Sequence, residues 1–292
     1  MDVAVQIIAS GLTLGALYAV STVGLALVYG SLNMLNMSHG ALLALGGYVC
    51  FYAMTVLGLP ALAGVAAAMI VCGLAGLVIY HLVARPMLSS RNFETQVFIA
   101  TIGVGAVLEN LILRVFGPQP VAQPLRLQGA QVIGDVHIPN QNLLILGVAV
   151  AMMAVIAFLL NRTSIGRAIR ATAQNRDAAQ LMGVRIGRVY AEVLALSGAL
   201  AALSGVMISS LSSLLPNMGG DPMLKAFVIC VVAGLGNVYG AVTAAIVLGL
   251  LEAAIQYVFG VQYSFAILLV LVIAVLIWRP AGLFGRSQVV RL

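Results

Sequence analysis

The sequence predicts an all-α, polytopic integral membrane protein with about eight or nine transmembrane helices. Of its 292 residues, 62% are hydrophobic and 8% are charged, whereas a soluble domain carries about 25% charged residues. The 14 basic and 8 acidic side chains are too few to cover a soluble body of this size. The apolar runs lack period-two alternation and are too long for barrel strands, so helices must span the membrane.

Apolar runs delimit the expected spans. The first run is longer than the apolar core of a signal peptide, so we expect it to be retained as a span. The runs cover residues 4–29, 39–58, 60–82, 96–116, 142–160, 190–212, 224–239, 240–259 and 263–278. They leave little sequence for a soluble domain, and residues 1–292 are therefore expected to form a single transmembrane domain.

The basic residues predict which loops face the cytoplasm, because loops rich in Lys and Arg stay on that side. Most of them follow the third, fifth and last runs, namely Arg85, Arg91, Arg162, Arg167, Arg170, Arg176, Arg185, Arg188, Arg279, Arg286 and Arg291. The remaining three, Arg114, Arg126 and Lys225, are associated with loops on the opposite side. We therefore expect a cytoplasmic loop over about 162–189, a cytoplasmic C-terminus and an extracytoplasmic loop over about 117–141.

The side of the N-terminus depends on how many runs cross the membrane. If all the runs cross, the N-terminus lies outside. If the second run is re-entrant, eight spans remain and the N-terminus lies inside, with the same loops in the cytoplasm. The extracytoplasmic loop itself alternates around Gly134–Asp135, which indicates either a small β-hairpin or an irregular loop.

Two uncharged, polar segments, residues 30–40 and 233–240, interrupt the apolar pattern. Such breaks persist near membrane depth only where protein or a water-filled cavity satisfies the freed backbone groups. Each segment is therefore either part of a substrate pathway or a tight turn between two helices. The candidate pathway residues are Asn33, Asn36, Ser38, His39, Asn237 and Tyr239.

Two acids lie inside apolar runs, Glu109 in the fourth and Glu252 in the eighth. A carboxylate there costs about 2.5 kcal/mol or more unless it is paired or faces water. Gln256 follows Glu252 by one helical turn and could share a hydrogen bond with it. These acids either give the pathway polarity or couple protons, or they form interhelical hydrogen bonds or stay protonated.

The longest polar stretch on the cytoplasmic face predicts two short helices. Ser164 is placed to cap the first, which runs to about Ala173. Asn175 is placed to cap the second, Asp177 lies in its first turn, and Gly183 ends it in a left-handed conformation. Such a compact helical segment suits docking into a groove on another protein. The alternative is a solvated basic loop that contacts anionic lipid.

Four separated motifs, in order along the chain, resemble the permeases of ABC importers for branched-chain amino acids (the LIV/HAAT-type, LivH-like family). They are Leu35–Tyr48, the cytoplasmic stretch 166–183, Ala233–Glu252 and Arg279–Gly285. In the cytoplasmic stretch, the resemblance implies an ATPase-coupling loop. The residues assigned to this coupling loop are Gly166, Arg167, Ala168, Arg170, Ala171, Asn175, Asp177, Ala179 and Gly183.

The resemblance implies a permease subunit of the bacterial inner membrane that translocates branched-chain or hydrophobic amino acids by alternating access. Its expected partners are a second homologous permease, two ATP-binding subunits, a periplasmic amino-acid-binding protein and membrane lipid, with no nucleic acid. ATP and Mg²⁺ would be bound by the ATPases. This chain is expected to bind no cofactor or metal and to have no catalytic residue, in line with the lack of a GxxxxGK[ST] phosphate loop.

Two alternatives remain open. A urea or short-amide permease of the same family would share these motifs, because substrate selection is expected in the binding protein. A stand-alone secondary transporter or channel would account for the broken helices and the intramembrane acids, but it would not account for the docking loop.

Overall fold

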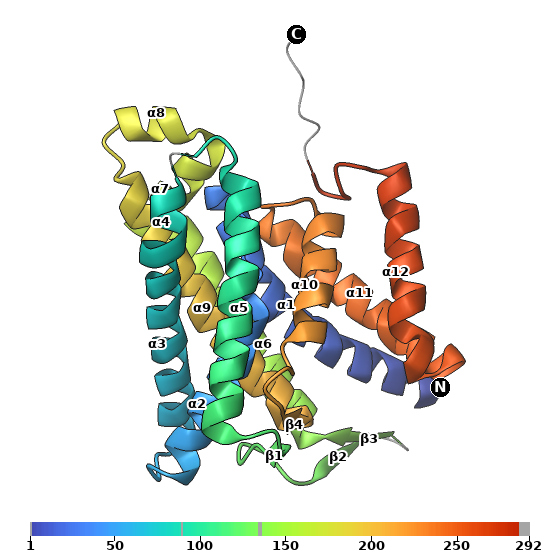
Figure 1. The fold of residues 1–292 in the computed structure, drawn as a ribbon. Coiled ribbons are helices and arrows are strands. Elements are labelled where there is room, and N and C mark those ends of the chain that lie inside the picture. The colour runs from blue at the N-terminus through green and yellow to red at the C-terminus, as the bar shows by residue number, and fades with distance from the viewer. Residues whose placement is uncertain (1, 89, 134–135, 286–292) are drawn as a thin grey trace.

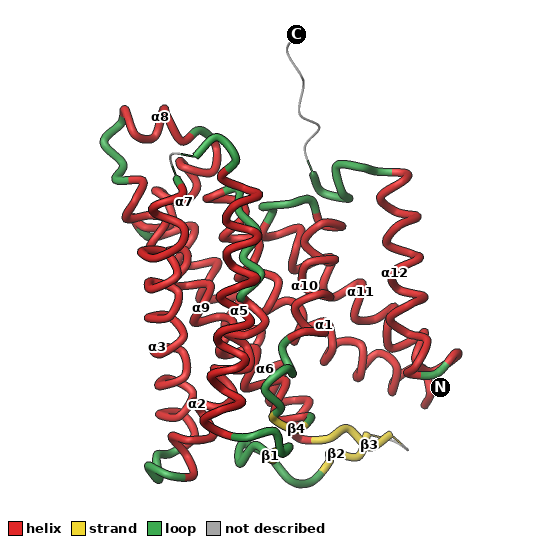
Figure 2. The backbone as a smooth tube through the Cα atoms, viewed as in Figure 1, coloured by secondary structure: helices red, strands yellow, loops and turns green. Residues whose placement is uncertain are grey.

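The computed structural model describes residues 2–88, 90–133 and 136–285 as a bundle of helices with short strands at one end (Figures 1 and 2). The predicted all-α membrane fold is confirmed, since 7 of the described helices are long and apolar enough to cross a membrane. These are α1 (Asp2–Leu32), α3 (Ala61–Ile79) continued through a π-helical turn (Tyr80–Ala84) into α4 (Arg85–Met87), α5 (Phe93–Phe116), α6 (Asn140–Arg162), α9 (Ile186–Leu211), α11 (Val238–Phe259) and α12 (Val261–Trp278).

Two further apolar helices are shorter. Helix α2 (His39–Thr55) has 17 residues and α10 (Gly220–Ala233) has 14. At 1.5 Å per residue, α10 is about 21 Å long, less than the hydrocarbon thickness of about 30 Å. The expected span over 224–239 is thus wrong in extent. Helix α10 begins at Gly220, after a non-helical segment over 212–219 that contains Pro216. It ends before Gly234, which has a φ of +93°.

The helices alternate in direction along the bundle (Figure 1). Helix α1 begins at the end that carries the strands, and α12 ends at the opposite end, where α7 (Ser164–Gln174) and α8 (Arg176–Leu181) lie. Opposite ends for the start of α1 and the end of α12 are also what the alternative with all the runs crossing leads us to expect.

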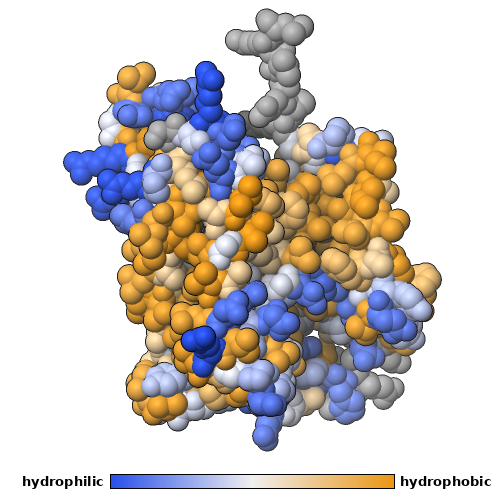
Figure 3. All heavy atoms as spheres, in the orientation of Figure 1, coloured by the Kyte–Doolittle hydropathy of each residue, from blue (hydrophilic) through white to orange (hydrophobic). Residues whose placement is uncertain are grey.

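The centre of the bundle is α9. Most residues of its apolar stretch are buried, whereas few residues of α12 are. Small residues let the helices approach closely, as expected for membrane helices. At Gly205 of α9, an added Cβ would overlap the carbonyl oxygen of Leu43 in α2. Figure 3 shows an apolar belt between polar ends, and exposed side chains such as Leu62 and Trp278 are suited to contact lipid.

Of the two alternatives for the loop over 117–141, the structure shows the hairpin. Strand β2 (Ala130–Ile133) pairs antiparallel with β3 (Val136–Pro139), while the predicted turn Gly134–Asp135 lies outside the described residues. A second two-stranded sheet joins β1 (Val121–Ala122) to β4 (Ser213–Leu214) and so ties this loop to the end of α9. Arg286 and Arg291, expected at the cytoplasmic C-terminus, also lie outside the described residues.

Candidate functional site

The polar stretch at the end of α6 folds into the two helices that the sequence predicts, α7 and α8. The cap of α7 is Thr163 rather than Ser164, because the Gly166 N–H donates to Thr163 Oγ1 at 3.1 Å. The cap of α8 is Asn175 as predicted, since its Oδ1 accepts from the Ala178 N–H at 3.0 Å. Asp177 lies in the first turn of α8, where a carboxylate complements the helix dipole.

Helix α8 ends in a Schellman motif at Gly183, which confirms the predicted left-handed cap. Gly183 has a φ of +86°. Its N–H donates to the Gln180 carbonyl at 3.0 Å, and the Val184 N–H donates to the Ala179 carbonyl at 3.0 Å. These bonds satisfy carbonyl groups that would otherwise be free at the helix end.

Helices α7 and α8 pack against the end of α6 and the start of α9. Gly166 is packed against the last turn of α6, where an added Cβ would overlap the carbonyl oxygens of Leu159 and Leu160. The Arg170 guanidinium donates to the Leu160 carbonyl. Ala179 is buried in the cluster that also contains Ile186 and Tyr190 of α9. Ala168 and Ala171 pack at the margin of this same cluster, and Arg167 is exposed.

The tip of α8 projects away from this anchor. Leu181 is 88% exposed and the adjacent Met182 is 85% exposed. Leu181 is the last residue of α8, and Met182 is its C-cap. The other face of this helix carries Ala179 and Arg176, and the Arg176 guanidinium carbon lies 5.7 Å from the centre of the Tyr190 ring. The result is an apolar tip on an ordered support, at an end of the bundle where hydrophilic side chains gather (Figure 3).

The first break, between α1 and α2, is satisfied by protein groups, as the sequence argument required. The Thr101 hydroxyl of α5 accepts from the Met37 N–H at 3.1 Å and lies 3.5 Å from the Leu35 carbonyl. Asn36 Oδ1 accepts from the backbone N–H of Ser38 at 3.2 Å and from its hydroxyl at 2.6 Å.

His39 begins α2 between two other helices. Its Nε2 lies 3.5 Å from the hydroxyl of Ser21 in α1, and its Nδ1 lies 3.5 Å from the hydroxyl of Ser197 in α9. His39, Ser38 and Asn36 are all at most 1% exposed. In this conformation, these three candidate pathway residues lie together in the protein interior.

The second break is a tight turn at the end of the bundle that carries α7, rather than an interruption at mid-depth (Figure 1). Asn237 caps α11 by accepting from the Gly240 N–H at 2.9 Å. Its Nδ2 donates to the Phe284 carbonyl at 3.1 Å, which places the Arg279–Gly285 motif directly on this turn. Tyr239 is exposed, and its hydroxyl accepts from Asn161 of α6 at 2.8 Å.

The two breaks meet at Gly30 and Gly236, where an added Cβ on Gly30 would come within 2.9 Å of the Gly236 carbonyl oxygen. Beside this contact, Asn237 and Tyr239 line a cavity of about 550 Å³ with the end of α1. Asn33 lies on a separate cavity. The structure therefore does not bring all the candidate pathway residues into one site.

Glu252 lies in a cluster that joins three helices. Its Oε1 lies 2.6 Å from Lys225 Nζ of α10, and its Oε2 accepts from the hydroxyl of Tyr18 in α1 at 2.7 Å. Lys225 also donates to Tyr18 at 3.0 Å, and Gln256 donates to Glu252 at 3.2 Å, as the one-turn spacing predicted. In this conformation, Glu252 is thus held by interhelical hydrogen bonds and an ion pair. Glu109 is only partly buried, on α5.

Lys225, which the sequence associates with a loop on the opposite side, lies within α10. Sequence reasoning also missed the break before α10. Gly219 meets Gly40 so closely that an added Cβ would overlap the Gly40 carbonyl, and the Gly40 N–H lies 3.3 Å from Met223 Sδ. The signal was present in the uncharged run Pro216–Gly220, which resembles the first break in composition.

Comparison with known proteins gives matches over nearly the whole chain. Residues 7–276 match the family described as "Branched-chain amino acid transport system / permease component". The chain is 31% identical to the high-affinity branched-chain amino acid transport system permease protein BraD of Pseudomonas aeruginosa, over 97% of this chain and 96% of that protein. It is 29% identical to the corresponding Escherichia coli K12 permease LivH, over 96% and 95%. A probable LivH of Methanocaldococcus jannaschii is 26% identical over 90% and 86%.

Proposed function

Because the chain belongs to the branched-chain amino acid transport system permease family, we propose that it is the permease subunit of an ATP-driven importer that moves branched-chain or related hydrophobic amino acids by alternating access. The observation that carries this proposal is the ordered coupling loop, α7 and α8, with its exposed tip at Leu181 and Met182. An isolated transporter has no use for such a docking element.

The coupling loop is proposed to face the cytoplasm. Residues 162–189, which include the coupling loop, carry six of the arginines that flank the apolar runs, and the positive-inside rule assigns such loops to the cytoplasm. Helix α12 ends on the same side, so the C-terminus is cytoplasmic as well. The hairpin of β2 and β3 and the start of α1 are then extracytoplasmic.

Docking of an ATPase subunit is proposed to bury Leu181 and Met182. Fully burying one such side chain contributes about 1.5–3 kcal/mol, and a few well-buried residues commonly carry most of the binding energy of an interface. The capped ends of α8 hold the tip rigidly, so movement of the ATPase is passed to α7, α9 and the end of α6.

The remaining partners follow from the family. We propose that a second homologous permease completes the membrane unit and that two ATPases bind ATP and Mg²⁺, so this chain holds neither. A periplasmic binding protein would deliver the amino acid. The substrate pathway would pass Asn36, Ser38 and His39, which are buried in this conformation and would become accessible when the helices around α2 separate.

The test is uptake of labelled L-leucine into proteoliposomes that contain the complete complex and the binding protein. Uptake that requires ATP on the ATPase side, and that is lost in a Leu181→Asp/Met182→Asp variant which still inserts, supports the proposal. Leu127→Asp, a matched change at an exposed leucine on the hairpin side, should leave uptake intact. Uptake driven by an ion gradient with no ATPase present would refute the importer assignment.

A further inference from the structure

A cavity beside the coupling loop is not used by the function proposed above. It has a volume of about 530 Å³ and lies between the end of α1, the first turn of α5, the junction of α7 and α8, and Tyr190 of α9. Its volume falls within the range of about 300–1,000 Å³ that is typical of small-molecule sites. We call it the coupling-loop cavity.

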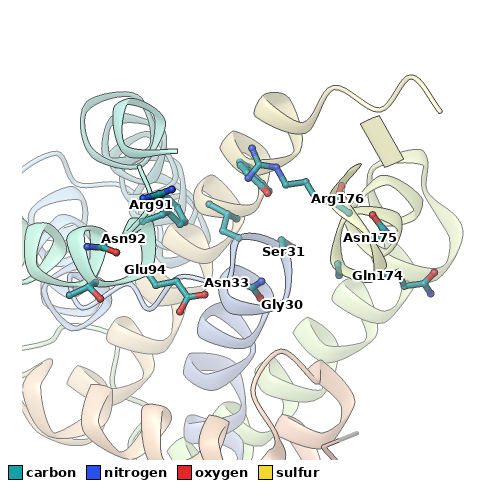
Figure 4. A pocket seen from close by; sticks show the side chains of 15 residues that line it. Gly30, Ser31, Asn33, Arg91, Asn92, Glu94, Gln174, Asn175 and Arg176 are labelled. Atoms are coloured by element: carbon teal, nitrogen blue, oxygen red, sulfur yellow. The ribbon is translucent and has the colours of Figure 1, made fainter. Parts of the chain in front are cut away.

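Charges of both signs face this cavity (Figure 4). Arg91 and Glu94 come from the start of α5, and Arg176 comes from the start of α8 on the opposite wall. Apart from Glu94, the charged residues that line the cavity are these two arginines. A purely anionic ligand would be repelled by Glu94 and a purely cationic one by the arginines, whereas a molecule with both charges can be complementary to the whole wall.

The start of α5 adds backbone donors to the same wall. Its N-cap, Asn92, makes no side-chain hydrogen bond to the first turn. The N–H groups of Phe93 and Thr95, both on the cavity wall, therefore have no side-chain cap, and such groups favour an anion at the positive end of the helix dipole.

A buried hydroxyl without a partner lies at the wall of the same cavity. Ser31 lines the cavity, is 7% exposed, and its hydroxyl has no hydrogen-bond partner within the described part of the chain. A buried polar group without a partner is costly and is rare in native proteins. Beside it, Asn33 has a φ of +51°, the only positive φ of a non-glycine residue in the described segments, a conformation that asparagine adopts readily at turns.

We propose that the coupling-loop cavity binds a zwitterion that carries one ammonium group and one anionic group. Glu94 receives the ammonium, and Arg91, Arg176 and the start of α5 receive the anion. Two sources share this chemistry: a free α-amino acid and the headgroup of phosphatidylethanolamine. Access from the cytoplasm rests on the orientation given under Proposed function. An occupied cavity would connect the junction of α7 and α8 to the start of the first break.

The test measures ligand binding by the complete complex without its binding protein, held in phosphatidylglycerol nanodiscs. Labelled L-leucine is the probe for the first source. Retention of phosphatidylethanolamine, measured by native mass spectrometry in mixed nanodiscs, probes the second. Glu94→Gln keeps the shape of an exposed side chain and removes its charge. Glu192→Gln is the matched control, since this acid lies outside the cavity and pairs with Arg188.

Glu94→Gln is expected to weaken binding of one of the two probes by about tenfold, the effect of losing one charge-assisted hydrogen bond, while Glu192→Gln leaves it within about twofold. In the amino acid case, L-leucinamide and 4-methylpentanoate, which each lack one charge, should bind about tenfold more weakly than L-leucine. The inference is overturned if neither probe binds, or if the two variants behave alike. ATP-driven uptake by the wild-type complex tests the proposed function separately, because it does not depend on this cavity being occupied.

Discussion

Replacing Lys225 by Met should destabilise the protein through the charge it leaves behind on Glu252. The carboxylate is only 1% exposed, and Lys225 Nζ lies 2.6 Å from its Oε1. Methionine has a similar length and fits the apolar surroundings of α10. The substitution therefore removes one ionic partner and leaves the hydrogen bonds from Tyr18 and Gln256 in place.

Breaking a buried ion pair by removing one partner costs about 3–5 kcal/mol, because the remaining charge is not compensated. With two hydrogen bonds left on Glu252, we expect a loss near the lower end, about 3 kcal/mol. Replacing both charges removes the penalty, so the Lys225→Met/Glu252→Gln variant should recover most of the loss.

The assay is thermal unfolding of the purified chain in detergent, with apparent midpoints compared under one heating rate. A loss of about 3 kcal/mol corresponds to a fall of several degrees in the midpoint for a chain of this size. Arg188→Met is the matched control. It breaks the pair with Glu192, where the Arg188 side chain is 72% exposed, and exposed pairs contribute about 1 kcal/mol or less.

Two results would refute this reasoning. If Lys225→Met and Arg188→Met lower the midpoint equally, the burial of Glu252 does not matter in the way described. If the double variant is no more stable than Lys225→Met, the penalty does not come from the unpaired carboxylate.

Three further predictions concern helix contacts and caps. Gly205→Ala should lower the unfolding midpoint by several degrees, because its Cβ would overlap the backbone of Leu43. Gly147→Ala, where the added Cβ meets open space, should be neutral or stabilising. Equal midpoints for the two variants would contradict the packing argument. Asn175→Ala should cost about 1 kcal/mol of local stability, seen as faster amide exchange confined to α8. Thr101→Val should accelerate exchange at Met37 by removing its acceptor, and Thr101→Ser, which keeps the hydroxyl, should not.

The positions of the membrane helices could be predicted because each long apolar run must be a helix in lipid. The caps at Asn175 and Gly183 were predictable for a related reason, since local hydrogen bonds and a positive φ depend on residues close in the chain. The error at Ser164 is one residue, because Thr163 and Ser164 are adjacent and both residue types cap helices, so propensity alone does not fix which one does.

The contacts between distant segments could not be predicted. Nothing local in the sequence pairs Lys225 with Glu252, which lies 27 residues further along the chain. The position of the Arg279–Gly285 motif on the turn at Asn237 likewise depends on how α12 folds back along the bundle.

The irregular segment before α10 had a local signal that was not used. Pro216, Asn217 and Gly219 are helix breakers or turn residues, but the apolar residues on both sides obscured them. The same reasoning that located the first break, an uncharged polar run without Lys or Arg, applies to this segment.

The most direct test of the importer account is site-directed cross-linking at the tip of α8 in native membranes. The three native cysteines, Cys50, Cys72 and Cys230, are buried, so a Met182→Cys substitution introduces a thiol that can be addressed selectively. The account predicts a cross-link from Met182→Cys to an ATP-binding subunit and none from Leu127→Cys at the hairpin end. A Met182→Cys variant that labels freely with a water-soluble thiol reagent in the active complex, and cross-links to no ATP-binding subunit, would contradict it.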